Sequence, residues 1–403
     1  MTWLCADIGT SSLKAALIDA EGVQHAFVRM RYRQSGRDGG TATPVPTVAA
    51  DWEAAFKDAV FTLRRQTQTD IAAICVSGNG PTFVPVDREG HALPPLAWYN
   101  APKRTAGPSL FLPHIAHFIA EQREQYDNTE TLFSCQEWLA WRLGAQAVSV
   151  LPNERFRPSY WDEAQCAAIG CAMRKLPPLV PLGTVIGKTG GRAEKDFALP
   201  PHIPIVAGGP DFIMALIGTG TLAEGLVCDR AGTSEGINVC SRVPATTGNL
   251  RTLPHIADGL FNVGALIPRS GILFDDYRRD TLQEDRDYKE HLDALLKSAS
   301  LSEEDIAGRR VLLQMARQVK EKIALLREHG FPVTEMRVSG GQAKNALWNR
   351  MKAKIAGVTL AVPAITDGEL AGNACLCAVA QGEAADLHEA AAQIVRIKER
   401  YFP

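Results

Sequence analysis

One short pattern occurs twice in this chain and constrains its fold more than any other feature. Residues 4–7, an apolar run that ends in Asp, lead into the turn Gly9-Thr10-Ser11-Ser12, and a second apolar run follows. About 220 residues later, residues 226–229 lead into Gly232-Thr233-Ser234 in the same way. Short apolar runs joined by such a turn favour a β-hairpin. Two copies of the hairpin predict a duplicated chain with two α/β domains.

Composition excludes several broad classes of protein. The chain has 403 residues, with 43 basic and 45 acidic side chains, and this balance argues against a nucleic-acid-binding protein. Hydrophobic residues make up 46% and charged residues 22%, which is ordinary for a globular protein and argues against disorder. No apolar run reaches the roughly 18–20 residues that a membrane helix needs. We therefore expect no membrane partner and no nucleic-acid partner.

The N-terminus and the cysteines bear on localisation. Asp7 follows directly on the first apolar run and no basic region precedes it, so we expect no signal peptide. The nine cysteines form an odd set without the spacing of a disulfide framework, and Cys375 and Cys377 lack the partners of a zinc cage. Reduced thiols, no zinc site and a cytoplasmic protein are the expectation.

Periodicity and turn residues predict the remaining elements. Strands are expected at 71–76, 83–86, 203–206 and 336–339. Helices are expected at 51–65, over most of 110–175, and at 212–222, 311–328, 343–356, 368–381 and 384–400. The proline-rich stretch 177–204 is expected to be chiefly loop.

Three common catalytic motifs are absent. The segment 183–189 has only three residues between its glycines, where a phosphate-binding P-loop has four. No dinucleotide-binding glycine motif follows the first strand, and no nucleophile elbow occurs. ATPases of the P-loop type, nicotinamide enzymes and acyl transferases of the elbow type are therefore not favoured.

Glycine turns at strand ends are the remaining candidates for chemistry. The backbone N–H groups of the turn from Gly9 to Ser12 can hold an anion, Lys14 can add a positive charge, and Asp7 can hold hydrated Mg²⁺. Gly232-Thr233-Ser234 is a second turn of this kind, and Gly340-Gly341-Gln342-Ala343-Lys344-Asn345 is a third, between a strand and a helix. An ordinary hairpin turn is the alternative explanation of the first two, and an ordinary strand-to-helix turn is that of the third.

Asp211 follows Gly208-Gly209-Pro210 at the start of an apolar helix. A carboxylate there can cap the helix, or it can act as a general base beside glycines that leave room for a substrate. The two roles are compatible.

The order of these motifs resembles the FGGY carbohydrate kinases, and most of all their xylulokinase-like members. The resemblance rests on Asp7 to Ser12 with Lys14, Val76-Ser77-Gly78, Ala207 to Asp211, Gly232-Thr233-Ser234 and Gly340 to Asn345. It extends in order over nearly the whole chain. The helix at 137–144 and the small-residue helix at 369–382 are also similar to the family's.

This resemblance implies the two-domain actin/hexokinase/Hsp70-like (ribonuclease H-like) α/β fold, with Mg-ATP and sugar in an interdomain cleft. Residues 1–221 would form the sugar and phosphate domain and residues 222–403 the nucleotide domain. Asp211 matches the family's general base and Asp7 its Mg²⁺-associated carboxylate. The first two glycine turns match its phosphate loops. Gly340 and Gly341 match the adenosine motif, with Asn345 near the adenine. A homodimer is the family-level expectation for assembly.

The sugar side departs from the family pattern. Asn79-Gly80-Pro81 stands where xylulokinases have Gln-Met-His, and Trp98-Tyr99-Asn100 stands where many members have Trp-x-Asp. Phe212 follows the predicted base, where Gln or Asn is common. Asn79, Gly80, Trp98, Asn100 and Asp211 are nevertheless the substrate-binding candidates. The chain is also shorter than usual members, and no segment at 270–310 resembles the family's Leu-Pro-Tyr motif.

The sequence thus predicts phosphoryl transfer from ATP to a hydroxyl of a small sugar or polyol, with a ketopentose as the first expectation. Asp211 would accept the hydroxyl proton, and the cofactors would be ATP and Mg²⁺. Two alternatives remain open. One is a kinase homologue that binds nucleotide or sugar as a regulator, and the other is an actin- or Hsp70-like ATPase.

Overall fold

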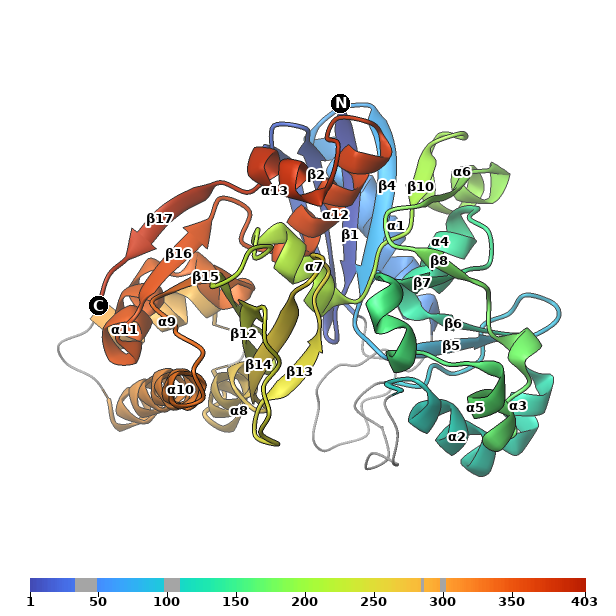
Figure 1. Ribbon diagram of the computed structural model, residues 1–403. Coiled ribbons are helices and arrows are strands. Elements are labelled where there is room, and N and C mark those ends of the chain that lie inside the picture. Colours follow the sequence, from blue (N-terminus) through green and yellow to red (C-terminus); the bar gives the residue numbers. More distant parts are fainter. Residues whose placement is uncertain (33–48, 98–108, 284–285, 298–301) are drawn as a thin grey trace. The chain divides into compact units, whose positions relative to one another are not determined.

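The chain divides into two compact units, which are described separately. The structure is a computed structural model that describes residues 1–32, 49–97, 109–283, 286–297 and 302–403 (Figure 1). The first unit contains Met1–Met214 and Glu369–Ile394, and the second contains Ala215–Gly368 and Val395–Pro403. Each unit is built around one mixed β-sheet.

The sheet of the first unit has six strands in the order β3-β2-β1-β4-β10-β9. Their bounds are β1 Thr2–Ile8, β2 Ser12–Asp19, β3 Gln24–Arg31, β4 Ile71–Gly78, β9 Val185–Lys188 and β10 Pro204–Val206. β1 pairs antiparallel with β2 and parallel with β4, and β4 pairs parallel with β10. The carboxyl ends of β1, β4 and β10 therefore meet at one edge of the sheet.

Alternation along β1 sends its side chains to two different layers. Leu4, Ala6 and Ile8 pack in a core with α1 (Ala49–Gln66) and α4 (Cys135–Leu143). Cys5 and Asp7 point to the opposite face, which α12 (Gly368–Ala380) covers. Close packing there needs small residues, since a Cβ at Gly372 of α12 would lie 2.2 Å from the Met214 carbonyl oxygen.

The remaining elements of the first unit surround this sheet. The strands are β5 Phe83–Val86, β6 Thr131–Ser134, β7 Ser149–Leu151 and β8 Leu179–Pro181. The helices are α2 Leu112–Glu121, α3 Arg123–Asn128, α5 Glu163–Ala168, α6 Gly191–Phe197 and α13 Leu387–Ile394, and α7 Asp211–Gly218 continues into the second unit. The stretch 177–204 thus holds two strands and a helix, where the sequence predicted chiefly loop. Its prolines lie at the ends of strands (Pro181 and Pro204) or in the connections between elements, where a missing N–H group costs no ladder hydrogen bond.

The sheet of the second unit has seven strands in the order β13-β14-β12-β11-β15-β16-β17. Their bounds are β11 Val227–Ala231, β12 Glu235–Ser241, β13 Arg251–Pro254, β14 Phe261–Ile267, β15 Glu335–Ser339, β16 Thr359–Pro363 and β17 Ile397–Tyr401. Its helices are α8 Gly271–Asp280, α9 Tyr288–Lys297, α10 Glu303–Glu328 and α11 Ala346–Ala356. α10 and α11 cover one face of the sheet with apolar side chains.

The two sheets share a topology, which confirms the predicted duplication. The order β3-β2-β1-β4-β10 in the first unit matches β14-β12-β11-β15-β16 in the second, with an antiparallel hairpin followed by two parallel strands in each. The turns Gly9–Ser12 and Gly232–Ser234 occupy equivalent places, at the tips of the two hairpins.

The C-terminal segment differs from its sequence-based prediction. By contact, α12 and α13 lie with the first unit, although residues 222–403 were expected to form one domain. The helix expected over 384–400 ends at Ile394, and β17 pairs antiparallel with β16. Val395, Ile397 and Tyr401 take alternate positions that suit an edge strand better than a helix face. Within the described ranges, no helix has the length and apolar character to cross a bilayer.

Candidate active site

The first glycine turn is a tight connection between β1 and β2. The Gly9 N–H donates to the Ser12 carbonyl at 3.1 Å, and a Cβ on Gly9 would lie 2.9 Å from that oxygen. The Ser12 hydroxyl accepts a hydrogen bond from Arg29 Nε at 2.9 Å, and the Tyr32 hydroxyl donates to the Gly9 carbonyl at 2.9 Å. β3 and the residue after it therefore hold the turn. Thr10 and Ser11 are partly exposed at its tip.

Asp7 lies at the end of β1 as a buried carboxylate in a charged cluster. Its Oδ1 accepts a hydrogen bond from the Ser77 hydroxyl at 2.8 Å, and its Oδ2 lies 3.8 Å from Lys14 Nζ. Lys14 is its direct register partner on β2. The pKa of Asp7 is raised to about 7: burial is the largest cause, the charges of Glu369 and Asp211 also raise it, and Lys14 and Ser77 lower it. A positive charge bound beside Asp7 would therefore lower this pKa and favour the ionised carboxylate.

Two residues of α12 complete this cluster, and the sequence did not predict them. Glu369 Oε2 lies 3.7 Å from Lys14 Nζ. Asn373 donates to the Ala6 carbonyl at 2.7 Å and to the Ser77 hydroxyl at 3.2 Å. A single acidic residue and a single Asn inside an otherwise small and apolar helix are the sequence signal for both. Their distance from β1 along the chain concealed that they face Asp7.

Asp211 is positioned by close backbone contacts at the ends of β4 and β10. A Cβ on Gly208 would lie 2.0 Å from the Val76 carbonyl oxygen, so only glycine lets β10 approach β4 here. The Gly78 N–H donates to the Gly209 carbonyl at 3.3 Å. Asp211 then begins α7, is half-buried, and is close enough to act on the pKa of Asp7. The structure therefore brings Asp7, Asp211 and Glu369 together at one sheet edge.

The charge of this cluster suits a hydrated divalent ion held by one or two carboxylates, and its three carboxylates do not converge as a set: among the described residues, the converging group is the partly exposed Asp87, Glu89 and His91. Asp7 and Glu369 lie 3.8 and 3.7 Å from the Lys14 ammonium group, and Asp211 adds a third negative charge that acts on Asp7. Mg²⁺ prefers one or two carboxylates together with waters and phosphate oxygens. Asp7, Asp211 and Glu369 are the residues that could hold it.

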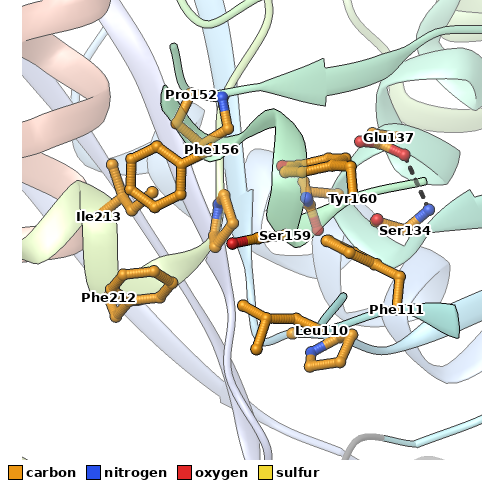
Figure 2. A pocket seen from close by; sticks show the side chains of 14 residues that line it. Leu110, Phe111, Ser134, Glu137, Pro152, Phe156, Ser159, Tyr160, Phe212 and Ile213 are labelled. Carbon is orange, nitrogen blue, oxygen red and sulfur yellow. Dashed lines mark hydrogen bonds between the residues drawn. The ribbon is translucent and has the colours of Figure 1, made fainter. Parts of the chain in front are cut away.

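A cavity of the first unit adjoins the Asp211 turn (Figure 2). Pro210, Phe212 and Ile213 line it next to Asp211, and Gly80 and Pro81 line it after Asn79. The side chain of Asn79 itself is buried and accepts a hydrogen bond from the Thr82 hydroxyl at 2.7 Å. Trp98 and Asn100, the other predicted substrate residues, lie outside the described residues.

In the second unit, the turn Gly232-Thr233-Ser234 joins β11 to β12. The Gly232 N–H donates to the Ser234 carbonyl at 2.9 Å, and the Ser270 N–H donates to the Thr233 carbonyl at 3.2 Å. A Cβ on Gly271 would lie 2.3 Å from the Gly232 carbonyl oxygen, so the start of α8 lies directly against the turn. The conformation of this turn is therefore set by α8.

A buried ionic cluster links the two strands that this turn joins. Lys352 of α11 lies 2.5 Å from Asp229 Oδ2 and also binds Glu235, the residues that flank the turn on β11 and β12. The Ser270 hydroxyl donates to Glu235 at 2.5 Å. Desolvation lowers the pKa of Lys352, but the two carboxylates outweigh it and raise that pKa above its usual value, whereas Lys352 holds the pKa of Glu235 low. No motif in the sequence marks these residues as a cluster.

The third turn, from Gly340 to Asn345, joins β15 to α11. Gly340 has a φ of +105°, and a Cβ on it would lie 2.0 Å from the Ala231 carbonyl oxygen, so this position requires glycine. Asn345 is the N-cap of α11, where its Oδ1 accepts from the Trp348 N–H at 2.9 Å and its Nδ2 donates to Asp293 at 2.9 Å. Both ends of the Asn345 side chain are thus engaged within the protein.

Comparison with known proteins finds similarity to carbohydrate kinases. Residues 302–381 match the C-terminal domain of the FGGY family of carbohydrate kinases. The chain is 21% identical over 472 residues to autoinducer-2 kinase of Enterobacter sp. (strain 638), covering 96% of this chain and 87% of that protein. It is 25% identical over 404 residues to L-fuculokinase of Escherichia coli O157:H7, covering 83% of each.

Solved structures show the same fold. Ligand-bound xylulose kinase from Lactobacillus acidophilus superposes with a TM-score of 0.77 at 17% identity, covering 100% of this chain and 94% of that one. The actin/hexokinase-like α/β fold that the family resemblance implied is confirmed. Together, the match of residues 302–381 and the relatives named as kinases make this chain similar to the carbohydrate kinases of the FGGY family.

Proposed function

We propose that this protein transfers the γ-phosphoryl group of ATP to a hydroxyl of a small sugar or polyol, with Asp211 as general base. The observation that carries the proposal is the cluster of Asp7, Asp211 and Glu369 at the sheet edge beside the cavity. Its carboxylates suit both proton acceptance and the binding of Mg²⁺. The relatives, an autoinducer-2 kinase and an L-fuculokinase, are named for small hydroxylated substrates.

In the proposed reaction, the acceptor oxygen attacks the γ-phosphorus, its proton passes to Asp211, and the bond to the β-phosphate oxygen breaks to release ADP. The N–H groups of the turns Gly9–Ser12 and Gly232–Ser234 and the ammonium of Lys14 would bind phosphoryl oxygens. Gly340 and Gly341 would lie against the adenosine, with Asn345 shaping that turn as its N-cap. Mg²⁺, when bound by Asp7 and its neighbours, supplies charge neutralisation on the phosphates.

Replacement of Asp211 tests the assignment. General-base catalysis contributes roughly 10²- to 10⁴-fold in rate, so Asp211→Asn should lose kcat on that scale and still bind ATP. ADP release is measured over a panel of ketopentoses, tetruloses, hexuloses and polyols, and ATP binding by calorimetry. Asp70→Asn, an exposed change in the same unit, is the matched control and should leave both unchanged.

Near-normal turnover by Asp211→Asn would show that Asp211 is not the general base. ATP binding by the native protein with no acceptor turnover would favour the regulator alternative, and rapid ATP hydrolysis without sugar would favour an ATPase.

A further inference from the structure

The wall of the cavity beside Asp211 is hydrocarbon over most of its extent. Phe111, Phe156, Tyr160 and Phe212 supply four aromatic rings. The other apolar lining residues are Pro81, Leu110, Pro152, Pro210 and Ile213. In Figure 2, Phe156, Phe212 and Ile213 lie toward one side of the cavity and Phe111 and Tyr160 toward the other. A ligand that enters between them meets ring faces and methyl groups.

Two of the polar groups in this wall are already satisfied within the protein. Glu137 accepts from the Ser134 N–H at 2.9 Å and from the Val150 N–H at 2.7 Å, as part of the capping box of α4. The Tyr160 hydroxyl donates to the Val150 carbonyl at 2.5 Å. Binding a ligand hydroxyl at either group would disturb these buried hydrogen bonds, which carries a cost in free energy.

Among the described residues that line the cavity, the polar capacity that remains is small. Gln136 and Ser159 are buried lining residues, and Gln136 Oε1 accepts a weak hydrogen bond from Cys135 Sγ at 3.4 Å. When a sugar that is hydroxylated at every carbon binds here, its hydroxyls lose their hydrogen bonds with water and gain few with these lining residues. A methyl group in the same place would lose nothing and would gain burial.

We infer that the acceptor carries a hydrocarbon end, as in a deoxy sugar or a methyl-terminated polyol, and that Phe156, Phe212 and Ile213 hold that end while Asp211 faces the reacting hydroxyl. This inference rests on the proposed kinase function and narrows its substrate class. Phe212 is the specificity-determining residue within it, because it directly follows Asp211 and lines the cavity.

Matched acceptor pairs that differ by one hydroxyl test the inference. The pairs are L-fuculose with L-tagatose, L-rhamnulose with L-fructose, and 1-deoxy-D-xylulose with D-xylulose. For each sugar, kcat/KM is measured from ADP release, and affinity without ATP is measured by calorimetry. An apolar wall discriminates against an added hydroxyl by roughly ten- to a hundredfold, and at least one deoxy member should exceed its partner by that ratio.

Two variants test whether Phe212 sets the ratio of kcat/KM between the deoxy sugar and its hydroxylated partner. Phe212→Asn gives the wall a hydrogen-bonding side chain and should reduce the deoxy preference to within about threefold of unity. Phe212→Leu keeps the wall apolar and should retain most of the preference. Because Phe212 is half-buried, both variants should fold, and circular dichroism checks that they do.

The outcomes separate this inference from the function on which it rests. Turnover with equal or greater kcat/KM for the fully hydroxylated members overturns the inference and leaves the kinase assignment intact. Preferential binding of the deoxy members without ADP release supports the inference about the cavity and overturns the kinase. Neither binding nor ADP release with any sugar overturns both.

Discussion

At the scale of single residues, His291 is a buried base that should make stability depend on pH. It is fully buried in α9, with its ring centre 5.5 Å from that of Phe274 and 5.7 Å from that of Tyr277. Desolvation and the positive charges of Arg286 and Arg278 lower the pKa of His291 to about 4. The native imidazole therefore remains neutral while the unfolded one takes up a proton below about pH 6.5.

The consequence is a loss of stability on acidification. Between about pH 6.5 and pH 4 the unfolded state binds more protons than the native state. The free energy of unfolding therefore decreases as the pH is lowered through this range, by up to about 3 kcal/mol from His291 alone. His291→Phe should remove that part of the slope in urea unfolding of the second unit. A variant whose stability has the same pH slope as the native protein would show that His291 is not responsible, and an NMR titration of the imidazole checks its pKa directly.

At the scale of elements, Lys352 joins α11 to the hairpin of β11 and β12. Lys352→Met would leave Asp229 and Glu235 buried without a counter-charge, and breaking such a pair costs about 3–5 kcal/mol. We expect the free energy of unfolding to fall by that amount and the KM for ATP to rise, because the turn Gly232–Ser234 loses its support. Adding Asp229→Asn and Glu235→Gln to the variant should restore much of the stability.

Arg242→Met is the matched control for this prediction. Arg242 Nε lies 2.7 Å from Glu224 in the same unit, but the two side chains are 71% and 54% exposed, so water replaces the pair and the loss should stay below about 1 kcal/mol. Equal destabilisation by the two changes would mean that burial of the Lys352 cluster does not set its contribution.

At the scale of the whole molecule, the first unit depends on a helix from the far end of the chain. Leu370, Ala374 and Cys377 of α12 are fully buried, and Asn373 binds the β1 backbone. A chain that ends at Gly368 should therefore lose the tertiary structure of the first unit. Hydrogen exchange in β1 and β4 measures this, and fast exchange is the expected result.

A chain that ends at Ile394 is the control for this truncation. It keeps α12 and α13 and lacks only β17, the edge strand of the second sheet. β1 and β4 should stay protected in it. Native protection of β1 and β4 in the shorter chain as well would show that α12 is dispensable for the first unit.

Local chemistry in the sequence was sufficient for the positions of the turns and of the Asp211 carboxylate. The turns Gly9–Ser12, Gly232–Ser234 and Gly340–Asn345 were predicted because each places glycine and small polar residues directly after an apolar run. The duplicated hairpin was predicted for the same reason. In the structure, close backbone contact requires glycine at Gly9 and a positive φ requires it at Gly340. These features depend on a few residues that are neighbours in the chain, and so they can be predicted from the sequence.

Only the tertiary structure placed Glu369 and Asn373 beside Asp7, buried Lys352 beneath its turn, and assembled an apolar cavity next to Asp211. Each of these joins segments that lie far apart in the chain, and the energy of such contacts comes from burial and charge in three dimensions. Amino-acid order alone carries no signal for which distant helix covers which sheet face. In this protein, the turns and Asp211 could therefore be predicted from the sequence. The charged residues near them, Glu369 and Lys352, and the apolar wall of the cavity were placed by tertiary packing.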